Sequence, residues 1–193
     1  MINRYRKYLQ ILDEKLDKMF KKQAPFIKCQ KGCAYCCKEG EYPMSELEFI
    51  EILFKYNELE QQIKDKVDAN ISNLLKSSRQ KLYECPFLVD NVCSVYQARG
   101  LICRTFGLLS YNDKTGKKKM PFCVDLGLNY SNVYDKDTKT LTECAPDGTE
   151  PLAFNIDRTT LRSPNIERDF NIFFGEDKAL VDWLREEFQA VVD

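Results

Sequence analysis

The chain has 193 residues, of which 44% are hydrophobic, so it can bury an ordinary core in a single domain that spans residues 1–193. Its 29 basic and 30 acidic residues nearly cancel, so no field of one sign favours nucleic acid or an anionic membrane surface as a partner. Charged residues recur through the first 22 positions and no run of about 20 apolar residues occurs, so we expect no signal peptide, no membrane span and a cytoplasmic protein.

The first 40 residues predict one helix followed by a loop. Between residues 2 and 22, apolar side chains recur at helical spacing with charged residues between them, which is typical of an amphipathic helix. The apolar positions are Tyr5, Leu9, Leu12, Leu16, Met19 and Phe20. Pro25 ends this pattern. The segment 26–40 combines four cysteines with Gly32 and Gly40, a composition that favours a tight loop, or knuckle.

Two further helices are predicted between the first and the second group of cysteines. Ser45 and Glu48 have the spacing of a capping box, so a helix is expected to begin there. Its expected buried face consists of Leu47, Ile50, Leu53 and Phe54. After a break near Asn57, a second apolar stripe continues to about Leu82. We expect the two helices to form an antiparallel pair that returns the chain to the first cysteines.

From residue 84 onward the sequence predicts short strands. Apolar pieces at 86–88 and 92–96 flank a turn at Asp90–Asn91. Further pieces at 108–111 and 120–124 flank the polar turn formers of residues 112–116, which indicates a hairpin. A small irregular sheet is therefore expected in this region.

The last third of the chain predicts loop and one closing helix. Residues 125–170 show no sustained period and are expected to be ordered loop. Leu180, Val181, Leu184 and Phe188 mark a helix whose start is signalled by residues 175–177. The prediction for the whole chain is a mainly helical α+β fold, with helices around a cysteine-rich metal-binding knuckle and a small irregular β-hairpin or sheet. Residues 25–125 would form the metal-binding core and residues 126–193 a loop-rich extension.

Nine cysteines and no histidine define the chemistry that the chain can perform. An odd number of cysteines in a long chain without an export signal indicates reduced thiols in a reducing compartment, and metal ligation explains them better than disulfides or burial alone. The lack of histidine excludes a nitrogen-rich zinc or copper site, a cysteine–histidine nucleophile and a serine–histidine–acid triad. Sulfur and carboxylate groups remain as possible metal ligands.

Cys29, Cys33, Cys36 and Cys37 lie within one short segment. Thiolates are soft ligands, and tetrahedral sulfur coordination selects zinc or the iron of an iron–sulfur cluster over magnesium or calcium. The gap between Cys33 and Cys36 occurs in zinc knuckles and in ferredoxin-like sequences, so the spacing does not name the metal. Because adjacent side chains start in different directions, Cys36 or Cys37 could serve a second site or a second iron.

A second group of cysteines follows the two helices and supplies the further candidate ligands Cys85, Cys93 and Cys103. Return of the chain would bring Cys85 toward Cys36. Cys123 would make eight sulfurs, enough for two four-cysteine sites or for one site with spare thiols. Cys144 is expected to be a bystander, because a free cysteine behaves as a small hydrophobe.

Cations are expected near these sulfurs, because four thiolates around one divalent ion leave net negative charge. The basic residues beside cysteines in the sequence are Lys28, Lys31, Lys38, Arg99 and Arg104. The lysines are equally well explained as surface charges. Arg104 is the stronger candidate, since a cation next to a thiolate lowers the pKa of the thiol.

Two blocks of the sequence together resemble a family of cysteine-cluster proteins described as zinc- or iron-chelating. The blocks are Cys29-x3-Cys33-x2-Cys36-Cys37 and the later Cys-Pro-Phe-Leu and Leu-Ile-Cys-Arg motifs, and the resemblance covers about residues 25–125. Members usually carry proline where this chain has Gly100, which affects a turn but removes no ligand. The resemblance implies binding of a metal or cluster, without a defined reaction, through Cys29, Cys33, Cys36, Cys37, Cys85, Cys93 and Cys103.

Other functions are weaker interpretations of the same residues. The first three cysteines, with Tyr35 before the third, also resemble the cluster motif of radical S-adenosylmethionine enzymes, but the repeated strand–helix units of those enzymes are not predicted here. A related domain of the flagellin lysine methylases keeps open a role in protein or peptide modification, although no glycine-rich methyl-donor loop follows a strand. Lys117, Lys118 and Lys119 could contact an acidic protein partner, but such a run is typical of a solvated turn.

Overall fold

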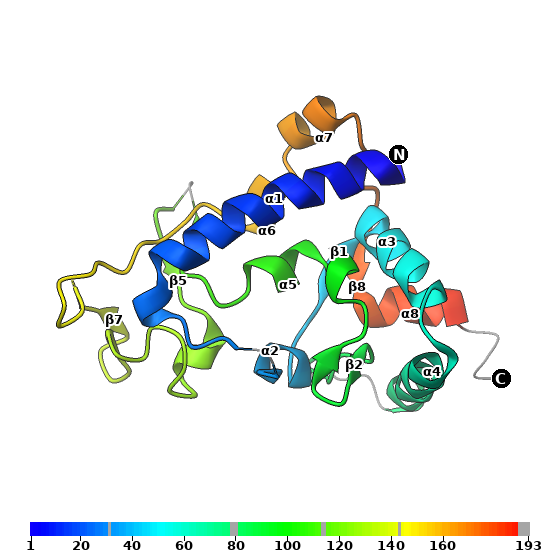
Figure 1. The fold of residues 1–193 in the computed structure, drawn as a ribbon, viewed down its shortest axis with the longest axis horizontal. Coiled ribbons are helices and arrows are strands. Elements are labelled where there is room, and N and C mark those ends of the chain that lie inside the picture. Colours follow the sequence, from blue (N-terminus) through cyan, green and yellow to red (C-terminus); the bar gives the residue numbers. More distant parts are fainter. Residues whose placement is uncertain (31, 78–80, 113–114, 143, 189–193) are drawn as a thin grey trace. The chain divides into compact units, whose positions relative to one another are not determined.

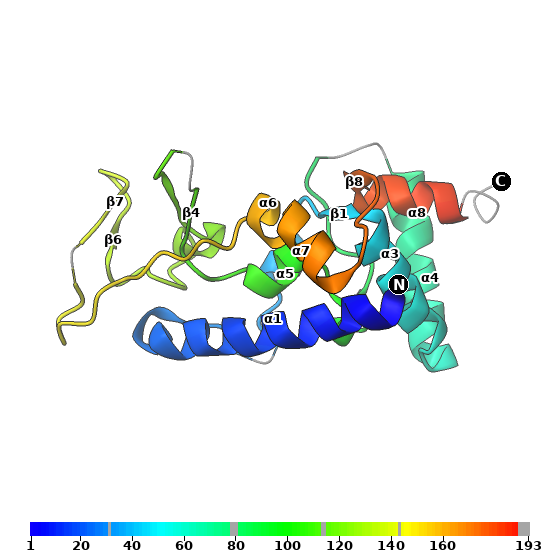
Figure 2. The same ribbon diagram turned by 90° about the horizontal axis from the view of Figure 1, so that it is seen from above.

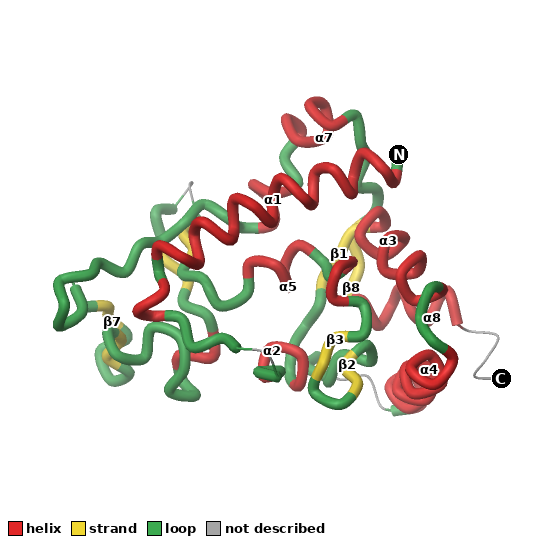
Figure 3. Tube along the Cα trace, viewed as in Figure 1, coloured by secondary structure: helices red, strands yellow, loops and turns green. Residues whose placement is uncertain are grey.

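The computed structural model describes residues 1–30, 32–77, 81–112, 115–142 and 144–188 of the chain. These residues pack as two compact units. Unit 1 comprises residues 1–2, 31–103 and 171–193, and unit 2 comprises residues 3–30 and 104–170. The predicted mainly helical α+β fold is confirmed, because helices dominate and the strands are short and antiparallel (Figure 3). The single domain over residues 1–193 and the cysteine-rich knuckle stay predictions.

Unit 1 combines helices from the middle and the end of the chain with two small sheets. Its helices are α2 (Tyr35–Lys38), α3 (Glu46–Asn57), α4 (Gln61–Lys76), the 3₁₀ helix η2 (Tyr96–Ala98) and α8 (Leu180–Phe188). Its strands are β1 (Pro43–Ser45), β2 (Leu88–Val89), β3 (Val92–Cys93) and β8 (Asp177–Ala179). Strand β1 pairs antiparallel with β8, and β2 pairs antiparallel with β3 (Figure 1). Helix α5 (Leu101–Thr105) runs across the boundary between the units in the sequence.

The core of unit 1 joins α3, α4 and α8 to the β1–β8 ribbon. Phe49 of α3 stacks on Trp183 of α8 with ring centroids 5.5 Å apart, a geometry that adds about 0.5–1.5 kcal/mol to the burial of the rings. The indole N–H of Trp183 donates to the C=O of Met44 at 3.1 Å. Val67 of α4 is completely buried in the same core. The middle of the chain is thus held to its C-terminal helix.

Part of the predicted face of α3 is wrong. Leu47 is buried as predicted, but Phe54 is 48% exposed. The stripe that packs in the core is instead Phe49, Ile52 and Tyr56. Leu47, Glu48 and Phe49 are consecutive and all buried, so α3 is covered on more than one side. Its apolar period therefore does not single out one buried face.

The course of α4 also differs from the prediction. The helix ends at Lys76, where the Ser77 hydroxyl donates to the C=O of Leu74 at 2.7 Å, and the predicted continuation toward Leu82 includes residues 78–80, which lie outside the described part. Figure 1 shows α4 nearly end-on while α3 runs across the view, so the two helices cross steeply and are not an antiparallel pair. The reason is that α4 packs its buried stripe against α8 and β2.

The closing helix begins later than predicted. Residues 175–177 were expected to start it, but Asp177–Ala179 form β8, and α8 begins at Leu180. The N–H of Leu180 donates to the C=O of Tyr42 at 2.9 Å, which continues the pairing of β8 with β1. A three-residue strand is too short for an alternating pattern to be recognised in the sequence.

The carboxylate of Glu48 joins the starts of two helices. The N–H and the hydroxyl of Ser45 donate to Oε2 of Glu48 at 2.9 and 2.8 Å, and the N–H of Glu48 donates back to the Ser45 hydroxyl at 3.3 Å, which confirms the predicted capping box. Its other oxygen, Oε1, accepts the N–H of Leu101 at 2.7 Å. A Cβ at Gly100 would lie 3.2 Å from this Oε1, so the glycine leaves room for the contact. One buried side chain therefore fixes both α3 and α5.

Unit 2 contains the long first helix and several short elements. Its helices are α1 (Ile2–Lys22), α6 (Arg158–Leu161), α7 (Pro164–Phe170) and the 3₁₀ helices η1 (Ala24–Phe26) and η3 (Phe122–Val124). Its strands are β4 (Ser110–Tyr111), β5 (Lys118–Lys119), β6 (Tyr134–Asp135) and β7 (Thr140–Leu141), paired as β4–β5 and β6–β7. The helix predicted between residues 2 and 22 is confirmed.

Helices α6 and α7, in a segment predicted to be loop, dock against α1 (Figure 2). The hydroxyl of Tyr8 donates to the C=O of Leu161 at 2.6 Å, and its ring lies 5.1 Å from the ring of Phe170. The sequence did carry signals for both helices. Asp157 caps α6 by accepting the N–H of Thr160, and a proline occupies the first position of α7.

The apolar pieces around Asp90–Asn91 and the hairpin predicted over residues 108–124 both form short hairpins. In the β2–β3 hairpin, Asp90 and Asn91 have φ values of 52° and 60°, as its two-residue turn requires. The β4–β5 hairpin is confirmed, although residues 113–114 of its turn lie outside the described part. Residues 120–124, expected as a strand, instead contain η3, because Pro121 removes a backbone donor and precedes a helical turn. The strands form separate two-stranded sheets, where one small sheet was expected.

The architecture bears on two classes of function. Among the residues that the structure describes, the named strands pair only as two-stranded antiparallel sheets, so the repeated parallel strand–helix units of a radical S-adenosylmethionine barrel do not occur there. None of the described helices is long and apolar enough to span a membrane.

Replacing Glu48 with glutamine should lower the free energy of unfolding by about 1–3 kcal/mol, because an amide cannot accept from all the buried donors that the carboxylate serves. Chemical denaturation of wild type and Glu48→Gln measures the difference. Glu58→Gln is the matched control, since Glu58 forms only an exposed ion pair with Lys55, and it should change stability by less than about 0.5 kcal/mol. Equal stability of Glu48→Gln and wild type would contradict the account.

Candidate metal centre

A single helical turn carries two of the predicted ligands. The N–H groups of Cys37 and Lys38 donate to the C=O of Ala34 at 2.8 and 3.0 Å, so α2 forms where a loop was expected. The sulfurs of Cys36 and Cys37 lie 4.0 Å apart. Two sulfurs on one tetrahedral zinc are about 3.8 Å apart, because each Zn–S bond is about 2.3 Å long. Adjacent cysteines here have a separation that suits one ion.

Backbone hydrogen bonds return Cys85 to this turn. The N–H of Cys85 donates to the C=O of Cys37 at 2.7 Å, and Gly40 and Tyr83 form an antiparallel bridge nearby. The hydroxyl of Tyr42 donates to the same Cys37 carbonyl at 2.9 Å. The predicted return of Cys85 to the first cysteines is therefore confirmed, although the helices between them cross steeply.

Cys93 and Cys103 reach the same part of unit 1 on two other elements. Cys93 pairs with Leu88 across the β2–β3 hairpin, and the N–H of Leu88 donates to the C=O of Cys85 at 2.9 Å. Cys103 lies on α5, whose first N–H is held by Glu48. Each of these cysteines is half-buried. Hydrogen bonds thus link the segments of Cys37, Cys85 and Cys93, and Glu48 anchors the helix of Cys103.

The thiols act on one another electrostatically. Burial is the largest cause that raises the pKa of Cys85 and of Cys93, and it raises the pKa of Cys103 to about 12. For Cys36, the hydrogen bond with Cys37 is the largest cause of a raised pKa, followed by burial. The charges of Cys36, Cys93 and Cys103 raise the pKa of Cys85 further. Those of Cys36 and Cys93 also raise the pKa of Cys103, and that of Cys36 raises the pKa of Cys93. Several of these thiols can ionise together at neutral pH only if a cation offsets their charge.

Arg99 supplies positive charge to this group. Its guanidinium lowers the pKa of Cys93 and of Cys103, opposing the effect of burial. It also lies over the ring of Tyr96, 4.0 Å from the centroid, which orients the side chain. Arg99 is therefore a predicted cation that acts on the sulfurs of Cys93 and Cys103.

The other predicted cations have different surroundings. Arg104, the favoured candidate, is buried in unit 2 and forms an ion pair with Asp13. The ammonium group of Lys38 lies over the ring of Tyr35. Lys31 lies outside the described residues.

Unit 2 holds the predicted ligands Cys29, which is exposed, and Cys123, which is buried in η3. Burial first, and then the charges of Cys123 and Cys29, raise the pKa of Tyr130 to about 12, against the lowering effect of the Leu109 N–H that donates to the Tyr130 oxygen. The sulfurs of Cys29 and Cys123 thus both lie near one buried hydroxyl.

Two further cysteines lie outside helices and strands. Cys33 is half-buried in the segment before α2, and Cys144 is exposed in unit 2. Within the part of the chain that the structure describes, no three or more cysteine, aspartate or glutamate side chains are already arranged to hold a metal ion. The chemistry of the donor set nevertheless fits zinc or iron, because the side chains that converge in unit 1 are soft sulfurs.

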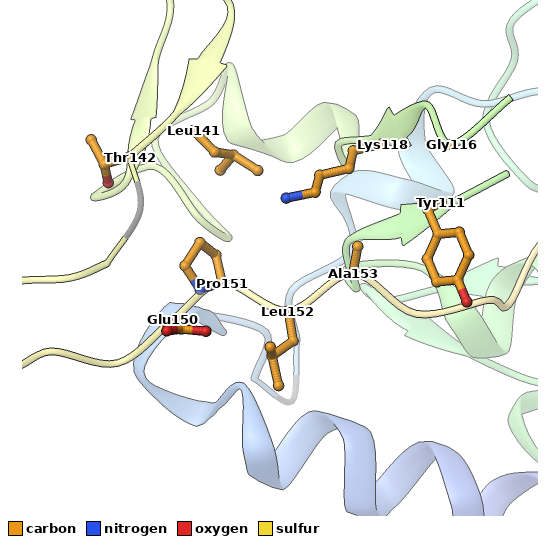
Figure 4. A pocket seen from close by; sticks show the side chains of 9 residues that line it. All are labelled: Tyr111, Gly116, Lys118, Leu141, Thr142, Glu150, Pro151, Leu152 and Ala153. Atoms are coloured by element: carbon orange, nitrogen blue, oxygen red, sulfur yellow. The ribbon is translucent and has the colours of Figure 1, made fainter. Parts of the chain in front are cut away.

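A hollow of about 600 Å³ in unit 2 is a second candidate site (Figure 4). The charged groups of Lys118 and Glu150 and the hydroxyl of Thr142 line it, together with apolar residues such as Leu141 and Leu152. Its lining residues include no cysteine. The hollow is open to solvent and offers no soft sulfur ligand. The cysteines outside it therefore remain the candidate metal ligands.

Three residues that contact candidate ligands or their segments were not predicted to do so. Tyr42 and Glu48 fix the backbone around the sulfurs, and the Asn129 side-chain amide donates to the sulfur of Cys29 at 3.2 Å. The capping box did single out Glu48, but only for α3. Nothing in the sequence near Tyr42 or Asn129 indicated their contacts with cysteine segments.

The sequence of the cysteine region matches the family model CxxCxxCC, whose description is "Putative zinc- or iron-chelating domain", over residues 28–124. This match covers half of the chain. The chain belongs to the CxxCxxCC family. The matched CxxCxxCC domain includes the candidate ligands in both units and supports a metal-binding role. No curated protein and no solved structure matches the chain significantly.

Zinc binding to the CxxCxxCC domain should release protons, and zinc affinity should rise with pH between about 6 and 8, because the ligands are thiols whose pKa is raised in the metal-free protein. Calorimetric titration with Zn²⁺ in buffers of different ionisation enthalpy measures the number of protons released. An affinity that stays constant with pH, without proton release, would exclude these thiols as ligands.

In the metal-free protein, the free energy of unfolding should fall as the pH rises. A thiol whose pKa is raised by folding stabilises the folded state below its unfolded pKa of about 8.5, and this contribution is lost as the pH rises toward the folded pKa. Unfolding by urea in the presence of a chelator should therefore require less denaturant at about pH 9.5 than at about pH 7.5. Stability that increased over this interval would contradict the raised thiol pKa values.

Proposed function

We propose that the chain binds zinc or iron, the latter as an ion or an iron–sulfur cluster, through a principal ligand set made of Cys36, Cys85, Cys93 and Cys103. Cys37 and Cys33 are further candidates in unit 1, and Cys29 and Cys123 are further candidates in unit 2. Four sulfurs around one ion give a closed structural zinc site, whereas an iron–sulfur cluster on the same ligands would transfer electrons or sense redox state.

The observation that supports the proposal is the set of contacts that link the segments carrying these cysteines. Cys85 is hydrogen-bonded to the carbonyl of Cys37, Cys93 sits on a hairpin bonded to Cys85, and Cys103 lies on a helix anchored by Glu48. Grouped thiols that stay protonated do not stabilise a fold more than apolar side chains would, because apolar side chains fill the same volume equally well. A ligand that needs several sulfurs explains the grouping.

The charge of the site supports a divalent or cluster-bound cation. A cation that binds four thiolates removes the mutual repulsion that raises their pKa values, and Arg99 offsets part of the remaining negative charge. The family description gives the same two metals, zinc and iron, that sulfur ligands select.

Serine variants test the principal ligand set. Cys85→Ser, Cys93→Ser and Cys103→Ser should each lose most of the zinc or iron that co-purifies with wild type, because a serine hydroxyl is a poor replacement for a thiolate ligand. Metal content per chain is measured by mass spectrometry of the purified protein. Cys144→Ser is the matched control, since this exposed cysteine lies outside the proposed site, and it should keep the wild-type metal content.

The proposal would be wrong if all three ligand variants kept the full metal content of wild type. Circular dichroism of each variant, compared with wild type prepared with a chelator, separates loss of a ligand from loss of the fold. A variant that is folded and metal-free supports the assigned role of its cysteine.

A further inference from the structure

A buried asparagine contacts the sulfur of Cys29. Asn129 is 0% exposed, and each of its side-chain polar atoms has a partner in unit 2. Its Oδ1 accepts the N–H of Lys28 at 2.8 Å. Its Nδ2 donates to the C=O of Gly107 at 2.8 Å and to Sγ of Cys29 at 3.2 Å. The backbone beside Cys29 and the sulfur itself are thus held by one amide group.

These contacts fix which way the amide points. Because the Lys28 N–H is a donor and the Gly107 C=O is an acceptor, only the observed orientation satisfies both. An N–H of Asn129 must therefore face the Cys29 sulfur. The sulfur is an acceptor in this contact, which is the role that a thiolate performs better than a thiol.

The position of Gly107 shows that the space around this contact is closely filled. Gly107 has a φ of +98°, and a Cβ there would lie 2.8 Å from Nδ2 of Asn129 and 3.1 Å from Sγ of Cys29. A larger residue would strain the backbone and displace the amide or the sulfur. The glycine leaves room for the amide and the sulfur to meet.

The segment that carries Cys29 is anchored next to Asn129. The N–H of Tyr130 donates to the C=O of Phe26 at 2.9 Å, and the rings of these two residues stack with centroids 5.5 Å apart. Both rings are completely buried in the core of unit 2. The backbone on each side of the contact is therefore fixed, so the amide meets the sulfur in a defined geometry.

We propose that Asn129 is a positioning residue for Cys29, whose side-chain N–H orients the sulfur and stabilises its negative charge when it binds a metal. The inference rests on the proposed function, because it assigns Cys29 as a ligand. Donors to a ligand sulfur act in this way at metal centres generally, where their loss weakens metal binding about 10–100-fold. Asn129 lies outside the residues 28–124 that match the family, so this part of the centre would come from the following segment.

Two measurements with defined metals test this role. Protein labelled with ¹⁵N-asparagine is titrated with Cd²⁺, a soft probe for thiolates, and the side-chain N–H signals of Asn129 should shift, while those of Asn155 elsewhere in unit 2 should not. Zn²⁺ affinity, measured by competition with a chelator, should be at least about tenfold weaker in Asn129→Ala than in wild type. Asn155→Ala is the matched control and should bind Zn²⁺ like wild type.

Asn129→Asp covers the case in which the alanine variant does not fold. It keeps the shape of the side chain and an acceptor for the Lys28 N–H, but it removes the donor to the sulfur and adds negative charge, so it should also weaken Zn²⁺ binding about tenfold. Unchanged Zn²⁺ affinity in a folded Asn129 variant, or an Asn129 signal that does not respond while Cd²⁺ binds, would overturn the inference and leave the proposed function standing. Wild type that binds neither Zn²⁺ nor Cd²⁺ would overturn the proposed function itself.

Discussion

Thiols that share a small, half-buried volume repel one another when they ionise, and water is too scarce to solvate their charge. Cys36, Cys85, Cys93 and Cys103 are in this position, because burial and their neighbours raise their pKa values. A bound cation stabilises the ionised form of these thiols, because it attracts the thiolate charges that otherwise repel one another. The rest of unit 1 can be understood as the framework that keeps these sulfurs together.

That framework is made mainly of backbone hydrogen bonds and buried caps. The bond from Cys85 to Cys37 closes an excursion through two helices, and Glu48 joins α3 to the helix that carries Cys103. In unit 2 the Asn129 amide holds Cys29 in a comparable way. Metal sites depend on such supporting contacts because a ligand whose direction is already fixed loses less entropy when it binds.

Features with a local sequence signal, or that follow from a simple connection rule, could be predicted from the sequence, whereas contacts between distant residues that have no such signal could not. Helix α1 and the capping box at Ser45 have local signals, and the return of Cys85 followed from the need to close a connection. Strand β8 has a partner about 130 residues away, and Asn129 is 100 residues from Cys29. The cysteine types and their spacing indicated the chemistry, but the division of the sulfurs between two units required the structure.

The most direct test of the central claim is the composition of the protein purified under anaerobic conditions, measured as zinc, iron and acid-labile sulfide per chain together with a visible spectrum. The account predicts either colourless protein with stoichiometric zinc or coloured protein with iron, with sulfide in addition if a cluster is bound. Metal-free protein whose nine cysteines all titrate as free thiols under native conditions would contradict it.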